Sequence, residues 1–445
     1  MIGILRHTQF RRLFLAQVVA LVGTGLATVA LALLAYDLAG DRAGAVLGTA
    51  LAIKMAVYVL LAPLAAAFVP LARRKAVLIT LDLLRAGVAL ALPFVTEIWQ
   101  IYVLIALLQS ASAGFTPLFQ SLIPEILGDE RDYTRALSLS RLAYDLETLL
   151  SPALAAALLT LISFHGLFAG TSVGFVLSAV LVLRTVFPVA SAAHASGGPY
   201  ARAIRGMRIY LHTPRLRGLL ALNLCAAAGG AMVFVNTVVI VRSVLDGGEQ
   251  QVAWALAAFG GGSMLVALLL PRLLDRVSDR RAMLSSALLM VLALLATTLL
   301  WTAAPKLVGW STLLPAWALL GMAYAGLVTP GGRLLRRSAQ AADLPAVFAA
   351  QFSLSHACWL IAYPLAGWLG VTLGLGAALA ALSGLALLGL FAALRSWPAG
   401  DAAMLDHVHG DLPADHPHLR EPAANEGSGH AHAFVIDELH RRWPA

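Results

Sequence analysis

Long apolar runs separated by short polar segments dominate the pattern along this chain. About twelve runs occur, and each approaches the roughly 20 residues that an α-helix needs to cross about 30 Å of hydrocarbon. They cover residues 12–36, 44–69, 76–95, 100–122, 136–161, 166–187, 217–242, 251–271, 282–303, 311–332, 345–370 and 372–395. The short alternating segments that mark a transmembrane β-barrel are absent from the sequence. The pattern predicts an all-α membrane protein with twelve transmembrane helices.

The amino-acid composition also indicates an integral membrane protein. Hydrophobic residues make up 60% of the 445 residues, charged residues make up 12%, and the mean hydropathy is +0.82. Soluble domains are about 45–50% apolar and about 25% charged. The first run has full transmembrane length behind Arg6, Arg11 and Arg12, so we expect a retained helix rather than a cleaved signal peptide. Cys225 and Cys358 lie inside apolar runs and indicate no disulfide framework.

Basic residues gather in alternate loops and orient the predicted helices. One set of loops carries only Arg42, Arg242 and Lys306. The other set carries Arg6, Arg11, Arg12, Arg73, Arg74, Lys75, Arg131, Arg135, the arginines of 202–217 and 272–281, Arg333, Arg336 and Arg337. Because cytoplasmic loops collect positive charge, both termini are predicted to be cytoplasmic, in a cytoplasmic (inner) membrane.

The net charge is unevenly divided between the apolar body and the carboxy-terminal tail. Residues 1–396 contain 28 basic and 15 acidic residues, a net charge of +13, whereas residues 397–445 contain 3 and 8, a net charge of −5. No basic run is dense enough to follow a phosphate backbone, so we expect lipid rather than nucleic acid as the partner of the basic residues.

An internal repeat predicts two pseudo-symmetric halves of six helices. ALLQSASAG at 106–114 aligns with ALLGMAYAG at 318–326 at an offset of 212 residues, and the same offset relates Pro152 to Pro364. RRKAVL, ending at Leu78, aligns with DRRAML, ending at Leu284, at an offset of 206. We expect an amino-terminal half at 1–187, a linker with a short interfacial helix at 188–216, a carboxy-terminal half at 217–396 and a histidine-rich cytoplasmic tail at 397–445.

Several motifs resemble the major facilitator superfamily, over Leu13 to about Arg395. The loop signature of that family is similar to LLDRVSDRR at 273–281, which retains Asp275, Arg276, Arg280 and Arg281. In the first half the corresponding segment is AFVPLARRK, with Val69 and Pro70 where an acid and a base would stand. SPALAA at 151–156 resembles the antiporter signature of the family, and residues 121–141 resemble its drug and macrolide exporter branch.

The resemblance implies a monomeric secondary transporter with a central cavity lined by helices 1, 4, 7 and 10. On that basis the cavity candidates are Thr24, Thr28, Gln109, Ser112, Asn223, Asn236, Met322 and Tyr324. His356 is a further candidate, because the 212-residue offset places it on Tyr144; the alternative is a histidine satisfied by packing.

Charged residues inside the apolar runs are costly to bury and therefore indicate function or pairing. Asp82 and Arg85 are three residues apart, and Arg141 and Asp145 are four apart, so each pair can neutralise itself on one helical face. The two remaining charges, Lys54 and Glu147, lie about ten residues from a helix end, or roughly 15 Å deep.

Glu147 is the first candidate for proton coupling and Asp145 the second, because a carboxylate at mid-membrane is readily neutralised by a proton. The alternative for Glu147 is a structural ion pair with Lys54. The alternative for Asp145 is the local pair with Arg141.

The tail contains six histidines that are candidate metal ligands: His407, His409, His416, His418, His430 and His432. Imidazole binds nickel, zinc and copper, and His-x-His spacing recurs in this set. Some nickel-efflux members of the resembling superfamily also end in histidine-rich segments. The alternative is a solvated, disordered extension, whose end at 433–443 is apolar enough to dock as a short helix on the cytoplasmic face.

Three functions are compatible with these features: proton-coupled export of small molecules, efflux of divalent metal such as nickel, cobalt or zinc, and a non-transporting membrane sensor. The sequence contains no Walker loop and no HExxH motif, so we do not expect an enzyme. We expect no cofactor apart from a divalent metal at the tail. The expected partners are the lipid bilayer, the substrate and the coupling proton.

Overall fold

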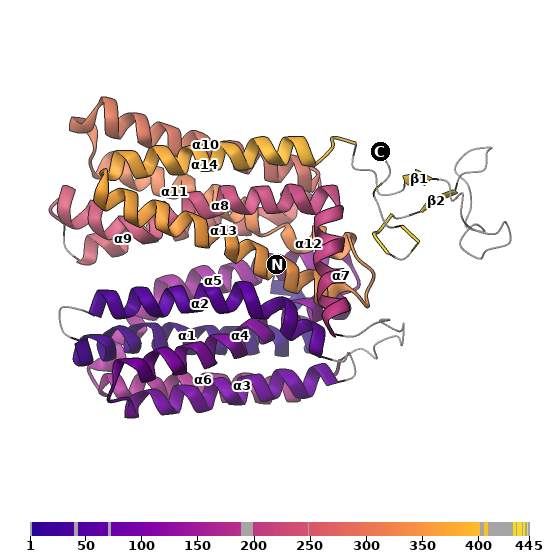
Figure 1. The fold of residues 1–445 in the computed structure, drawn as a ribbon, viewed down its shortest axis with the longest axis horizontal. Coiled ribbons are helices and arrows are strands. Elements are labelled where there is room, and N and C mark those ends of the chain that lie inside the picture. The colour runs from indigo at the N-terminus through magenta and orange to yellow at the C-terminus, as the bar shows by residue number, and fades with distance from the viewer. Residues whose placement is uncertain are drawn as a thin grey trace.

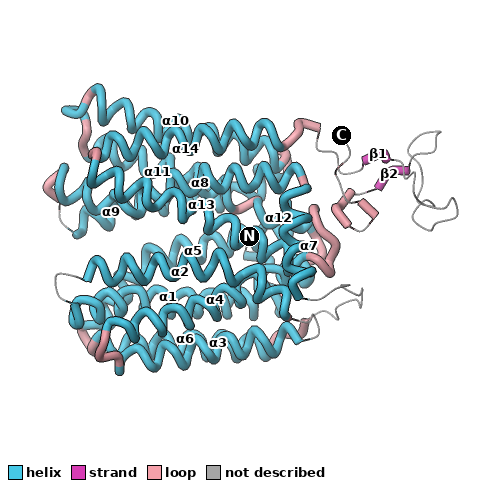
Figure 2. Tube along the Cα trace, viewed as in Figure 1, coloured by secondary structure: helices cyan, strands magenta, loops and turns pink. Residues whose placement is uncertain are grey.

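The computed structural model describes residues 2–39, 43–69, 73–187, 199–247, 249–400, 405–407, 430–432, 434–437, 439–440 and 443. Twelve helices of 18 to 32 residues make up most of this described part (Figures 1 and 2). They are α1 (Thr8–Ala39), α2 (Ala43–Phe68), α3 (Arg74–Ala91), α4 (Ile98–Ile126), α5 (Glu130–Leu159), α6 (Phe164–Leu183), α8 (Pro214–Val239), α9 (Glu249–Leu274), α10 (Asp279–Ala303), α11 (Trp310–Val328), α13 (Leu344–Thr372) and α14 (Leu375–Ser396).

Shorter elements connect the long helices. They are η1 (Ile2–Arg6), η4 (Leu92–Phe94), α7 (Pro199–His212), the π-helical turn η5 (Ile240–Val244), η6 (Pro305–Leu307), α12 (Gly331–Arg337) and the strands β1 (Leu405–His407) and β2 (His430–His432). The two strands pair antiparallel. The prediction of a helical membrane protein is confirmed, and each predicted apolar run corresponds to one long helix.

Ten of the described helices are long and apolar enough to cross a membrane. The two long helices outside this set are α2 and α5. Within α2, the stretch whose side chains the structure describes without a gap is Ile53–Ala62, and it is apolar. In α5 the charged residues Arg141, Asp145 and Glu147 follow four charged residues in the first two turns, which lowers the hydropathy of the whole helix.

The long helices form two groups, each with its own apolar core. Helices α1–α6 pack against one another, as α1 does on α6 and α2 on α4, and helices α8–α14 do the same, as α9 does on α11 and α8 on α14. Separate clusters of buried apolar side chains lie within each group. Figure 1 shows the indigo-to-purple group below and the pink-to-orange group above. The groups touch where α2 packs on α13 and α5 packs on α9.

The break between α13 and α14 lies at Gly374, whose φ of 89° is in the left-handed region that favours glycine. The sequence places this boundary at 370–372, a few residues early, because the apolar run continues through the break. A glycine in this conformation ends the helix without a polar interruption.

Two glycines bring α9 and α11 into close backbone contact. A Cβ atom at Gly262 would overlap the carbonyl oxygen of Ala318, and one at Gly321 would overlap that of Phe259. We expect Gly262→Ala to push the helices apart and to lower the free energy of unfolding by about 1–3 kcal/mol, the usual cost of overpacking. Thermal stability in detergent, followed by size-exclusion chromatography, measures this loss.

Gly261 is the matched control, because a Cβ atom there meets no atom within 4 Å. Gly261→Ala should leave the midpoint unchanged or raise it slightly, since alanine favours helix more than glycine does. Equal destabilisation by both substitutions would show that helix propensity, not the α9–α11 crossing, decides the effect.

Several described segments meet at one end of the helix bundle, which we call the α7 end. The backbone amide of Val186, after α6, donates to Oε1 of Gln9 in α1 over 2.9 Å, and Nζ of Lys75 in α3 donates to the carbonyl of Thr185 over 2.9 Å. α7 and α12 lie at this end as well, beside the tail (Figure 1). The start of the chain and the described tail thus lie at the same end.

The end of the tail docks on the group formed by α8–α14. Phe434, Ile436 and His440 are buried, and the guanidinium of Arg215 lies 5.0 Å from the Trp443 ring. The sequence predicts a short helix here, and this prediction is wrong for the residues of 434–440 that the structure describes. Asp437 Oδ1 accepts from the amides of residues 439 and 440, which fixes a turn instead.

Candidate functional site

One intramembrane ion pair is internal to the first group. Asp82 and Arg85 bond each other within α3, which confirms the predicted local pair. Ser178 Oγ of α6 donates to Asp82 over 2.8 Å. The Arg85 guanidinium lies between the rings of Phe115 and Phe175, at 4.0 and 4.6 Å. All of these partners belong to α3, α4 and α6, so this pair holds the first group together rather than linking the two groups.

A polar and aromatic contact joins the two groups near the middle of their long helices. Arg141 of α5 donates from Nε to Ser263 Oγ of α9 over 3.1 Å, and its guanidinium lies 4.9 Å from the ring of Tyr324 in α11. Tyr58 of α2 lies against the ring of His356 in α13, with centroids 4.8 Å apart. We use the name central seam for the residues at and around these contacts: Lys54, Tyr58, Gln109, Arg141, Glu147, Ser263, Tyr324, Phe352 and His356.

The first group supplies most of the polar atoms of the central seam. Tyr58 donates its hydroxyl to Gln109 Oε1 over 2.7 Å, and Lys54 Nζ lies 5.6 Å from the Tyr58 ring. Lys54 and Glu147 are close enough to interact electrostatically, as the ion-pair alternative requires. A side chain at Gly25 would overlap Ser151 and lie 3.1 Å from Glu147 Oε1, so glycine in α1 is what allows that helix to approach the carboxylate.

The second group supplies mainly aromatic rings. Tyr324 lies between Phe259 and Trp359, at centroid distances of 5.6 and 6.2 Å, and Trp359 also contacts Tyr363 at 5.0 Å. Phe234 of α8 completes the row at 5.4 Å from Phe259 and is 39% exposed. The row lines the central seam with rings that are tilted or edge-on to one another, beside the Arg141 guanidinium.

The remaining cavity candidates are distributed differently. Thr24 and Thr28 are exposed and bond carbonyls of their own helix, as the partly buried Ser112 does. Asn236 is buried and donates to the carbonyl of Ala366 over 3.1 Å, which ties α8 to α13. Asn223 is also buried, and Met322 is partly buried.

The ring of His356 lies in the central seam against Tyr58. Its Nδ1 atom has a hydrogen-bond partner within the same helix, the carbonyl of Phe352, at 2.7 Å. The side chain of Asp145 lies outside the described residues. The roles assigned to all these residues stay predictions.

Sequence reasoning missed Tyr58, Ser263 and Phe352. Tyr58 follows Lys54 by four residues and therefore shares its helical face, a signal that was available in the sequence. Ser263 and Phe352 carry no such signal, because serine and phenylalanine are ordinary in transmembrane helices. Only their contacts with Arg141 and Tyr58 identify them.

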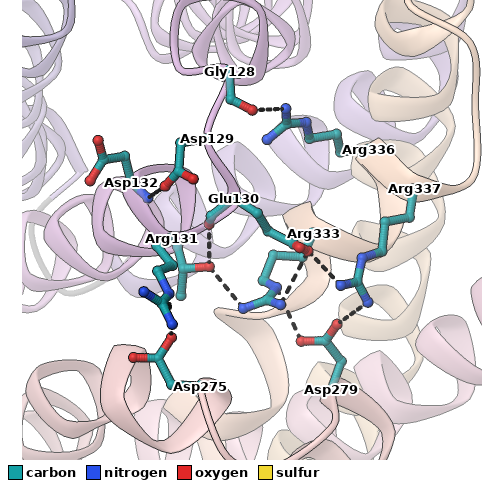
Figure 3. Close-up of polar contacts among 11 residues, drawn as sticks. Gly128, Asp129, Glu130, Arg131, Asp132, Asp275, Asp279, Arg333, Arg336 and Arg337 are labelled. Atoms are coloured by element: carbon teal, nitrogen blue, oxygen red, sulfur yellow. Dashed lines mark hydrogen bonds and ion pairs between the residues drawn. The ribbon is translucent and has the colours of Figure 1, made fainter.

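An ionic network joins the two groups at the α7 end (Figure 3). Glu130, at the start of α5, lies 2.6 Å from Arg337 and 3.1 Å from Arg333 of α12. Both arginines also contact Asp279, at the start of α10, over 3.0 and 3.2 Å. Asp279 and Arg333 are buried, whereas the side chains of Glu130 and Arg337 are 44% and 47% exposed. The buried pair belongs to one group, and Glu130 is the contribution of the other.

Further contacts surround the ionic network. Arg131 pairs with Asp275 over 3.3 Å, and Arg336 donates to the carbonyl of Gly128 over 2.6 Å (Figure 3). Of the predicted loop motif, Asp275 thus links the groups, while Arg280 donates to the carbonyl of Trp397 over 3.0 Å. Arg276 and Arg281 are exposed.

The acid that the ionic network buries is Asp279, which lies inside LLDRVSDRR and was passed over in the sequence. In the first group the 206-residue offset places Arg73 at the position of Asp279, and the neighbouring Arg74 pairs with Glu125, at 2.6 and 2.9 Å. That pair joins α3 to α4 and lies within one group.

The tail histidines are only partly described. The β1–β2 register sets His407 opposite His430 and Leu405 opposite His432. His409, His416 and His418 lie outside the described residues. Within the described part of the chain, no group of three or more His, Cys, Asp or Glu residues is arranged to hold a metal ion. Metal binding by the tail stays a prediction.

Comparison with known proteins gives the family. The sequence profile of the Major Facilitator Superfamily matches residues 13–246 and 219–407, which is most of the chain. The chain belongs to the Major Facilitator Superfamily. It is therefore a membrane transporter by family and fold, as the sequence motifs indicate.

Similar superfamily members include one curated protein and several solved structures. The "Uncharacterized MFS-type transporter YfiS" of Bacillus subtilis (strain 168) is 25% identical over 207 residues, 45% of this chain and 48% of that protein. The match thus spans about half the length of this relative. The human organic anion transporter MFSD10 (TETRAN) superposes with a TM-score of 0.72 at 15% identity, covering 87% of this chain and 99% of that one.

A bacterial homologue of the iron transporter ferroportin, in an outward-facing state, gives a TM-score of 0.71 at 13% identity, with 87% and 98% coverage. At these identities the superpositions show a shared fold.

Proposed function

We propose that this transporter exports small organic molecules in exchange for protons, by alternating access between two six-helix halves formed by α1–α6 and α8–α14. The observation that carries the proposal is the ionic network, because Glu130 of one group completes the charge pairing of a buried arginine and a buried aspartate in the other. A contact of this kind holds one end closed and breaks without a change in fold.

The α7 end is the cytoplasmic end in this proposal, and the structure corresponds to an outward-facing state. Loop charge supports the orientation, because the basic loops lie at this end and cytoplasmic loops collect positive charge. The ferroportin homologue of similar fold is in an outward-facing state. Opening the cytoplasmic end then requires Glu130 to leave Arg333 and Arg337, and this opening, with closure of the outer end, exposes the central seam to the cytoplasm.

Glu147 is the proposed site of proton exchange. Its attraction to Lys54 exists only while the carboxylate is ionised, so a proton arriving at Glu147 weakens the Lys54–Glu147 interaction inside the first half. Lys54 also lies over the Tyr58 ring, which contacts α13 of the second half. Protonation of one carboxylate thereby changes the contact between the halves.

Small organic molecules are the proposed substrates because the central seam combines a row of aromatic rings with the guanidinium of Arg141. MFSD10, which shares the fold, is an organic anion transporter. We do not advance metal efflux, because Glu147 and His356 are the two His, Cys, Asp or Glu residues of the central seam, and within the described part of the chain no group of three or more such residues is arranged to hold a metal ion.

Reconstitution into liposomes tests the function directly. With an imposed pH gradient, purified protein should drive accumulation of at least one member of a panel of aromatic organic ions, and a protonophore should abolish it. Transport that is indifferent to the pH gradient would contradict proton exchange and leave a facilitator. Gradient-driven accumulation of nickel or zinc, but of no organic ion, would contradict the substrate class.

Reporter fusions test the orientation. Alkaline phosphatase fused after Ala445 should be inactive and green fluorescent protein fused there should fluoresce, because both termini are predicted to be cytoplasmic. A phosphatase inserted after Lys306, in the loop containing η6 at the opposite end, is the control and should be active. An active phosphatase after Ala445 would place the tail outside and reverse the proposed direction.

A further inference from the structure

The helix α7 turns an apolar stripe away from the rest of the protein. Tyr200, Ile204 and Leu211 follow one another at helical spacings of four and seven residues and so lie on one side of the helix. Their side chains are 67%, 67% and 40% exposed. The opposite side carries Ile209 and Tyr210, which are buried. α7 is therefore apolar on two sides, and the protein covers only one of them.

The orientation of this exposed stripe is fixed by contacts on the buried side. Arg205 holds Asp343 at the start of α13 with two contacts, of 2.9 and 3.0 Å. Tyr210 donates its hydroxyl to Gln351 of α13. A Cβ atom at Gly206 would lie 2.5 Å from the carbonyl oxygen of Ala346, so the two backbones meet directly. α7 cannot rotate to bury its stripe without breaking these contacts.

The position of α7 fits a helix at a membrane surface. It runs across the long helices at the α7 end, whereas the long helices lie side by side along the long axis of the bundle (Figure 1). Since those helices cross the membrane, α7 lies close to the plane of the membrane surface. It packs against both α13 and α2, helices of different groups, where the two groups adjoin.

Charge complementarity identifies the surface that the stripe meets. Arg208 is exposed, lies beside the stripe on the helix, and makes no ion pair with another described residue. A long basic side chain next to an apolar stripe keeps its charge at the level of lipid headgroups while its stem follows the apolar surface. Cytoplasmic leaflets carry anionic phospholipids, which attract such residues.

We propose that α7 is a binding element for anionic phospholipid. The stripe of Tyr200, Ile204 and Leu211 inserts at the boundary between headgroups and acyl chains, and Arg208 binds the lipid phosphate. The bound lipid lies where α2 and α13 adjoin, at the edge of the contact between the two groups. This site is separate from the central seam and does not depend on the identity of the substrate.

Nitroxide labels on full-length protein in bilayer nanodiscs measure the depth of the stripe. Cys225 and Cys358 are buried, so a cysteine introduced by Ile204→Cys is labelled selectively. Collision with oxygen should exceed collision with a nickel chelate for this label. Arg276→Cys, on an exposed loop position at the same end of the bundle, is the control and should show the reverse order. Equal aqueous accessibility at both positions would overturn the proposal, and so would a label at 204 that neither reagent reaches, because a protein partner would then cover the stripe.

Native mass spectrometry tests whether α7 binds anionic phospholipid. Protein in phosphatidylcholine nanodiscs with a minor share of phosphatidylglycerol is released into a native mass spectrometer, and the retained lipids are counted. Arg208→Gln should lower retained phosphatidylglycerol by about fivefold, the usual contribution of one arginine near an anionic surface. Lys306→Gln removes one charge at the opposite end and should leave retention unchanged. An equal loss in both variants, or none in Arg208→Gln, would overturn the assignment.

Discussion

Replacing Glu147 by glutamine is expected to reduce proton-driven transport to the level of protein-free liposomes. Glutamine keeps the shape of the side chain but cannot bind and release a proton, so the exchange step has no carrier. Substrate binding should persist, because the aromatic row and Arg141 are unchanged. Accumulation under an imposed pH gradient and binding by fluorescence titration, measured on the same preparation, separate the two effects.

The pH dependence gives a second readout for this variant. Residual transport by Glu147→Gln, driven by a substrate gradient alone, should not change with pH over the range in which the wild-type rate changes. Asp132→Asn is the control, since Asp132 lies in the same helix but pairs with Arg135 over 2.9 Å at the exposed start of α5. If Glu147→Gln keeps gradient-driven accumulation, the coupling carboxylate lies elsewhere, and Asp145→Asn is the next variant.

Replacing Glu130 by glutamine is expected to shift the transporter toward the state that is open at the α7 end. The substitution removes a charge that contacts Arg333 and Arg337 at 3.1 and 2.6 Å. Because Glu130 is nearly half exposed, each contact is worth about 0.2–1 kcal/mol, and losing two contacts changes the equilibrium by roughly 2- to 30-fold. The pair of Arg333 with Asp279 stays intact within its own half, so the fold is retained.

Pulsed electron paramagnetic resonance measures the shift. Labels at Arg73→Cys and Arg276→Cys lie on exposed loop positions of the two halves, and a longer distance component should grow in Glu130→Gln. Asp132→Asn again serves as the control, because its ion pair stays within α5. Unchanged distances in both variants would show that the ionic network does not hold this end closed.

The ionic network at Glu130 and the central seam at Glu147 are connected by a single helix. Glu130 and Glu147 both belong to α5, separated by 17 residues, or roughly 26 Å along the helix at its usual rise. Between them lies Arg141, which reaches Ser263 and Tyr324 in the other half. A movement of α5 as a rigid element therefore acts on the ionic network and the central seam together.

The sequence by itself determined the number of long helices, their approximate ends and the family. It did so because a membrane forces each spanning segment to satisfy its own backbone hydrogen bonds, so that length and hydropathy, which are local properties, specify the element. The pair of Asp82 and Arg85 was predictable for the same reason, since three residues along one helix fix their separation. The sequence placed the α13–α14 break a few residues too early, and the left-handed conformation of Gly374 sets its position in the structure.

Only the tertiary structure decided which distant residues meet. Arg141 contacts Ser263, 122 residues away, and Glu130 contacts Arg333, 203 residues away, and neither pair has a spacing that a helical period can reveal. At the tail end Asp437 fixes a turn, and Trp443, which packs on Phe434, contacts Arg215 of α8, more than 200 residues away in the sequence. Tertiary contacts also decide which side of α7 is exposed. The amphipathic pattern of α7 is local, but the contacts of Arg205, Gly206 and Tyr210 with α13 select the side that is buried. Periodicity specifies elements, whereas the pairing of charges and faces between elements depends on how the two groups of helices pack.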